Sequence, residues 1–127
     1  MAVQTILAFN LNAPALDALG KICADLGLRM KAVPKEGFLM PLGGMIGMPV
    51  RSVSSPSAEN FDEPMLVMCG LNEAKLNGFL QALRRSSVPA IPLKAVLTPT
   101  NAAWNALTLH EELRREHEQM LRMRKDQ

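Results

Sequence analysis

The chain has 127 residues, of which 48% are hydrophobic and 20% are charged, and its formal net charge is +2. This length and composition predict one globular domain over 1–127, with a core that needs no metal, cofactor or disulfide to form. The small net charge argues against nucleic acid as a partner, and no apolar run approaches the ~20 residues of a membrane helix.

The cysteines and the N-terminus indicate the compartment. Cys23 and Cys69 form neither a C-x-x-C motif nor a metal-binding spacing, and each lies in an apolar pattern. We therefore expect two buried free thiols, as in a reducing cytoplasm, rather than a disulfide. The first residues lack the basic start and the cleavage site of a signal peptide, so we expect a cytoplasmic protein of bacterial type.

An internal repeat organises the chain. Residues 6–12 align with residues 66–72 at an offset of 60, and apolar positions keep this offset as far as Val33 and Leu93. Two copies indicate a duplicated supersecondary unit, because a solenoid needs three or more. We place the first repeat at about 3–34 and the second at about 65–98.

Each repeat has the pattern strand, helix, strand. An apolar run of strand length comes first, over 3–9 and again over 65–69. Asn12 and Asn72 then have the side chain of a helix N-cap, and apolar residues recur after them at helical spacing. Gly27 is expected to end the first helix, and an alternating strand follows it.

The strand compositions predict the order of the sheet. The first strand of each repeat is apolar on both faces, as central strands are. The second strands carry Arg29 and Lys31, or Pro92 and Lys94, which suits the edges. We therefore expect an α+β fold, a ferredoxin-like plait with a four-stranded antiparallel sheet, two helices and an added C-terminal helix. The alternative is a small three-layer α/β fold.

Two helices cover only one face of such a sheet, and the other apolar face needs a cover. The connection over about 35–64 begins with an apolar, glycine-rich stretch. We expect this stretch to be a flap over the open sheet face or a dimer contact, and its alternative role is a lid over a pocket. The candidate flap residues are Leu42, Gly43, Gly44, Gly47 and Pro49.

The tail, about 105–125, is predicted to be helical. Thr108 with Glu111 fits a capping box, and Asn105 is a competing N-cap. His110 and His117 are not at the i,i+3 or i,i+4 spacing of helical metal ligands, so we expect no metal site there.

A Thr-Pro-Thr-Asn turn follows the last strand and precedes the single tryptophan. One interpretation is a rigid turn that ends the strand, with the tryptophan buried in the core. The other is a small polar site with an apolar wall, although no nucleophile–base set accompanies it. The candidate residues of this site are Lys94, Thr98, Pro99, Thr100, Asn101 and Trp104.

The second half of the chain resembles an uncharacterised bacterial family, number 3783 of the domains of unknown function. The resemblance covers roughly 65–120, and its specific parts are 93–101 with Trp104 and the glutamate- and histidine-containing helix over 111–117. Leu42 to Pro49 also resembles a segment of longer members. The resemblance implies no activity, and it singles out Thr98, Pro99, Asn101 and Trp104 for testing.

No motif specifies an activity. We expect a non-enzymatic regulatory module that binds a small ligand or a protein, as a homodimer formed through the open sheet face or the tail. A small enzyme with its site at the Thr98–Trp104 turn is the first alternative. Nucleic-acid binding is the second, through the cations Arg29, Lys31, Arg84 and Arg85.

Overall fold

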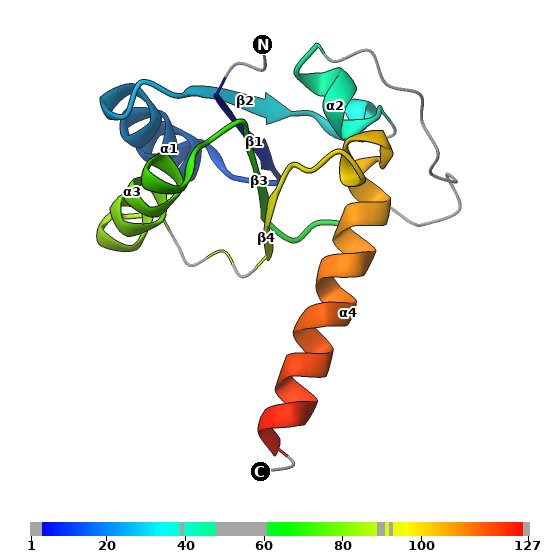
Figure 1. Cartoon of the computed structure of the whole chain (residues 1–127). Coiled ribbons are helices and arrows are strands. Elements are labelled where there is room, and N and C mark those ends of the chain that lie inside the picture. The colour runs from blue at the N-terminus through cyan, green and yellow to red at the C-terminus, as the bar shows by residue number, and fades with distance from the viewer. Residues whose placement is uncertain (1–3, 39, 48–60, 89–90, 92, 126–127) are drawn as a thin grey trace.

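A four-stranded sheet lies at the centre of the protein, with helices on both of its faces (Figure 1). This computed structural model describes residues 4–38, 40–47, 61–88, 91 and 93–125. The sheet is built from two βαβ units. The first contains β1 (Thr5–Phe9), α1 (Ala13–Asp25) and β2 (Arg29–Val33). The second contains β3 (Met65–Cys69), α3 (Glu73–Arg85) and β4 (Leu93–Val96).

Asparagine begins the long helix of each unit. The Asn12 side chain accepts from the backbone N–H of Ala15 at 3.0 Å, and the Asn72 side chain accepts from that of Lys75 at 2.8 Å. These bonds satisfy backbone donors that have no partner inside the helix. Gly27 has φ +70° in the turn that joins α1 to β2, a conformation that glycine adopts without strain. Both expected N-caps are confirmed.

The expected antiparallel plait is wrong. The strand order is β2-β1-β3-β4, and β2 runs parallel to β1 just as β4 runs parallel to β3. The single antiparallel pairing joins β1 to β3, with Leu7 opposite Val67. The sheet is therefore mixed. The first strands of the two units are central and the second strands are at the edges, as their compositions predicted.

The long connection between the units explains the difference. In a plait, the second and third strands form a hairpin, which inserts one unit's strand between the two parallel strands of the other. Here the chain between Val33 and Met65 is too long for a hairpin, and parts of it that the structure describes, 38, 42–46 and 61, pack over the sheet instead. Each helix then crosses between adjacent parallel strands, which is the ordinary βαβ connection.

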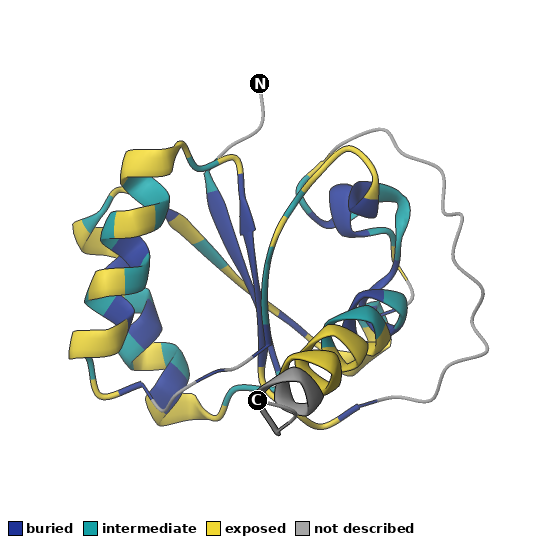
Figure 2. Cartoon of the chain, turned by 60° about the horizontal axis from the view of Figure 1, so that its bottom comes forward, coloured by how far each residue is buried: buried dark blue, intermediate teal, exposed yellow. Residues whose placement is uncertain are grey.

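The α1 and α3 helices cover one face of the sheet. Ile6 and Ala8 of β1, together with Leu66 and Met68 of β3, are buried on this face against Leu19, Phe79 and their neighbours. Figure 2 shows these helices on one side of the sheet, with their buried residues turned inward.

The connection and the start of the C-terminal helix cover the other face. The connection contains η1 (Lys35–Gly37) and α2 (Leu42–Met45), and η2 (Asn101–Ala103) leads into α4 (Ala106–Lys125). The side chains that pack on this face include Leu7, Phe9, Phe38, Leu42, Met45, Phe61, Met65, Val67, Cys69, Leu107 and Leu109. The chain itself thus buries the sheet face that we considered for a dimer.

Two backbone hydrogen bonds join the two parts of this cover, the connection and the segment that leads into α4. Leu42 N–H donates to the Trp104 carbonyl at 2.8 Å, and Ala106 N–H donates to the Phe38 carbonyl at 3.0 Å. The Asn105 side chain accepts from Thr108 N–H at 2.9 Å, so Asn105, and not Thr108, is the N-cap of α4.

Candidate functional site

The turn after β4 is held by the side chain of Asn101. Its Oδ1 accepts from the backbone N–H of Thr98 at 2.8 Å, and its Nδ2 donates to the Val96 carbonyl at 3.0 Å. In return, Asn101 N–H donates to Thr98 Oγ1 at 3.1 Å. Asn101 is buried, and both ends of its amide bind backbone within the turn. This geometry favours the interpretation of a rigid turn.

We expect Asn101→Ala to lower the free energy of unfolding by about 1–3 kcal/mol, because it leaves the Thr98 N–H and the Val96 carbonyl without their partner. Urea unfolding followed by circular dichroism measures the change. Thr100→Ala is the matched control, since Thr100 is exposed and its side chain does not cap η2. Equal stability of the two variants would contradict a structural role for Asn101.

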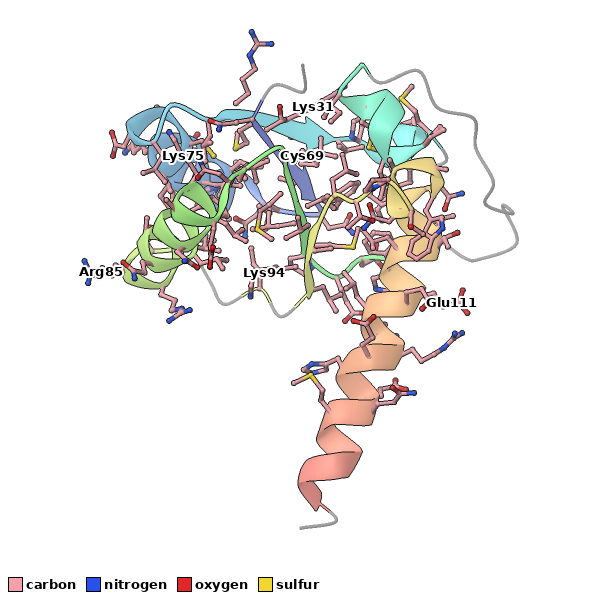
Figure 3. The ribbon with its side chains drawn as sticks, in the orientation of Figure 1. Lys31, Cys69, Lys75, Arg85, Lys94 and Glu111 are labelled. Carbon is pink, nitrogen blue, oxygen red and sulfur yellow. The ribbon has the colours of Figure 1, made fainter. Side chains whose placement is uncertain are left out.

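The structure does not bring the other predicted site residues together. Lys94 is in register with Leu66, so it lies on the face that α1 and α3 cover, and its Nζ donates to the Ile91 carbonyl. Figure 3 shows Lys94 on the α3 side of β4. Trp104 packs against the core of the opposite face. The remaining candidates, Thr98, Pro99 and Thr100, are exposed.

The candidate flap residues have different surroundings. Leu42 and Gly43 are buried residues of α2, which is part of the cover on the sheet face opposite α1 and α3. Gly44 is half-buried, and Gly47 is exposed with φ +84°, which favours glycine at the turn after α2. Pro49 lies outside the described residues.

A polar network that the sequence did not indicate fastens residues 61–63 to α4. His110 Nε2 lies 3.1 Å from Glu63 Oε1, and the His110 ring stacks on Phe61 with the centroids 4.0 Å apart. From the other side, Asn10 Nδ2 donates to the carbonyls of Phe61 and Glu63 at 2.8 and 3.1 Å. These contacts give His110 a structural role. No local pattern could have predicted them, because the partners are 47 to 53 residues apart.

The C-terminal part of α4 extends away from the body of the protein (Figure 1), and we call residues 114–120 its exposed half. The first turns of α4 are buried, but residues 114–120 are all exposed. Arg115 Nη1 lies 3.0 Å from Glu112 Oε1, and Arg114 Nη2 lies 3.6 Å from Glu118 Oε1. Exposed pairs of this kind stabilise a helix only slightly. Met120 is 57% exposed, which is unusual for a large apolar side chain on an otherwise polar helix.

Three further features bear on function: groups of metal-ligating side chains, the cysteines and the apolar character of the helices. Among the described residues, no group of three or more His, Cys, Asp and Glu side chains is placed to hold a metal ion. Cys23 and Cys69 are free and buried on opposite faces of the sheet. Within the described ranges, no helix combines the length and the apolar character needed to cross a membrane.

The fold and the exposed surfaces define the class of protein: an α+β domain of two βαβ units around a mixed sheet, with a projecting C-terminal helix. Residues 64–120 match the family model described as Domain of unknown function (DUF3783), which confirms the resemblance found in the sequence. The matched part runs from the start of β3 into the exposed half of α4. No curated protein and no solved structure matches the chain.

Proposed function

We propose that the protein is a non-enzymatic, protein-binding module that forms a homodimer through the exposed half of α4. The observation that carries this proposal is the extension of α4 beyond the body, with Met120 exposed on it. A helix that contributed only to the core would not need the exposed length of about 10 Å over residues 114–120. The small enzyme at the Thr98–Trp104 turn has less support, because the amide of Asn101 is already bound within the turn.

The sequence of α4 suits antiparallel pairing with a second copy. Leu113 and Met120 are seven residues apart, so they lie on one side of the helix. Leu113 already packs partly against the core, so the short apolar seam open to a second copy is centred on the exposed Met120. Residues 111–118 hold four glutamates and two arginines, a net charge of −2, whereas residues 122–125 hold three cations and no acid. An antiparallel pair therefore places the acidic part of one helix beside the basic end of the other. The seam is short, so the expected dimer is weak.

Sedimentation velocity over about 10 μM to about 1 mM protein tests this proposal. We expect the weight-average mass to rise from monomer toward dimer with concentration. We expect Met120→Glu to weaken the association by at least about tenfold, because it puts a charge into the apolar seam. Gln119→Glu is the matched control, since it adds the same charge at an exposed neighbour outside the seam.

Two outcomes would overturn the dimer. One is a strict monomer at the highest concentration, and the other is equal association of the Met120→Glu and Gln119→Glu variants. Native mass spectrometry of the same samples reports the subunit number independently.

We also infer that the two βαβ units arose by duplication and that the protein works in the cytoplasm. In support of duplication, α1 and α3 begin 60 residues apart and each has an asparagine N-cap. In support of the compartment, both cysteines are free.

A further inference from the structure

The outer edge of β2 is a free sheet edge in the described part of the chain. Arg29 N–H donates inward to the Gln4 carbonyl at 2.9 Å, and Arg29 and Lys31 share this inward direction because backbone groups alternate along a strand. Met30 and Ala32 therefore direct their N–H and C=O groups outward. Because β2 is the terminal strand of the sheet, these outward groups have no strand partner among the described residues.

The opposite edge of the sheet, along β4, is partly covered by the chain itself. Leu97 N–H donates inward to the Met68 carbonyl at 2.9 Å, so the carbonyl of its neighbour Val96 is directed outward. The Asn101 side-chain amide donates a hydrogen bond to that carbonyl, and α4 contacts β4. Among the four described strands, the β2 edge is therefore the one with the longer run of outward groups left open to a further strand.

A basic groove runs along the open edge. It is a cavity of about 360 Å³, open to solvent, and it is lined by Thr5, Arg29, Met30, Lys31, Met45 and Ile46. Two of these side chains are cationic and none is acidic. Lys31 Nζ donates to the Met45 carbonyl at 3.0 Å, which holds the ammonium group between β2 and α2. An ammonium group has three donors, so two remain beyond this bond with the described residues. Figure 3 shows Lys31 in this region between β2 and α2.

We propose that the β2 edge binds an extended acidic segment of a partner protein by strand addition. The backbone of the segment pairs with Met30 and Ala32. Arg29 and Lys31 point to the α2 side of the sheet, because they are in register with Thr5 and Leu7. Alternate residues of the segment on that side are therefore acidic, and those on the other side are apolar and lie beside Met30.

A second copy of the chain does not fit this edge. Pairing of two β2 strands would bring the Arg29 and Lys31 side chains of both copies together, and like charges across paired strands are destabilising. The same cations that exclude self-pairing select an acidic partner. The β2 edge and the exposed half of α4 are separate surfaces, so this inference does not depend on the proposed dimer.

Fluorescence anisotropy with the full chain tests the proposal. The probe is a labelled peptide of about six residues that alternates glutamate and valine, and the comparison peptide alternates lysine and valine. We expect only the glutamate peptide to bind, with affinity that falls as salt is raised. We expect Lys31→Glu to weaken binding by at least about tenfold. Lys94→Glu makes the same charge change in β4, at the opposite edge of the sheet, and should leave the affinity unchanged.

A second probe separates strand addition from simple charge attraction. N-methylation of alternate backbone nitrogens of the glutamate peptide removes its hydrogen-bond donors without changing its charge. Strand addition predicts that the methylated peptide loses binding by at least about tenfold. Equal binding of the two peptides, or equal binding by the Lys31→Glu and Lys94→Glu variants, would overturn the proposal. The Met120→Glu variant should bind the peptide normally, so a failed dimer and a failed edge site remain distinguishable.

Discussion

Replacing Phe38 with alanine should lower the free energy of unfolding by about 3–5 kcal/mol. Phe38 is 1% exposed, and its ring lies edge-on to Phe9 and stacked on Phe61, with centroid distances of 5.4 and 5.0 Å. Truncation removes these contacts and leaves a cavity between the sheet and the segments that cover it. Urea unfolding followed by circular dichroism measures the loss.

Met40→Ala is the matched control for this experiment. Met40 lies two residues further along the same segment but is 49% exposed, so its truncation should change stability by no more than about 0.5 kcal/mol. If Phe38→Ala were as mild as Met40→Ala, the connection would not be part of the core. The second sheet face would then need another cover, and a dimer through that face would become the better hypothesis.

Local features of the fold were predictable from the sequence. The N-caps Asn12 and Asn72 accept hydrogen bonds from residues three positions later, so the local sequence is enough to predict them. The central position of β1 and β3 follows from strands that are apolar on both faces, because only a sheet covered on both sides buries them. Such inferences depend on neighbours in the chain or on burial alone.

The direction of strand pairing was not predictable in this way. A βαβ unit fixes its two strands as parallel, but whether they are adjacent depends on where the next unit enters the sheet. The length of the connection between Val33 and Met65 was the one available signal, and it excludes the tight hairpin of a plait. The contacts of Asn10, Glu63 and His110 had no signal at all, because they join segments distant in sequence.

The candidate site also combines a part that the local sequence predicted with a part that it could not predict. The Thr98–Asn101 turn was visible in the sequence, but the hydrogen bonds that bind the Asn101 amide internally depend on three-dimensional geometry. The placement of Lys94 could have been inferred. In an alternating strand, Lys94 lies on the face opposite to Leu93 and Ala95, so it does not converge with a tryptophan on their side.

The protein should lose stability in alkaline solution through its two cysteines. Burial raises the pKa of the Cys23 thiol from 9.0 to about 11 and that of the Cys69 thiol from 9.0 to about 12. Above pH 9 the unfolded chain releases protons that the folded chain keeps, so the free energy of unfolding falls as pH rises. The stabilisation is complete below pH 9 and is lost up to about pH 11 for Cys23 and about pH 12 for Cys69.

Urea unfolding at several pH values from about 7 to about 10, with a phosphine reductant, measures this effect. Each thiol should contribute a slope approaching about 1.4 kcal/mol per pH unit above its unfolded pKa. Other groups also titrate in this range, so the comparison is with Cys23→Ala and Cys69→Ala. Each variant should be less stable at neutral pH, because it leaves a small cavity, but should have a shallower alkaline slope. Slopes equal to that of the unmodified chain would mean that the thiols ionise as readily in the folded protein as in the unfolded one.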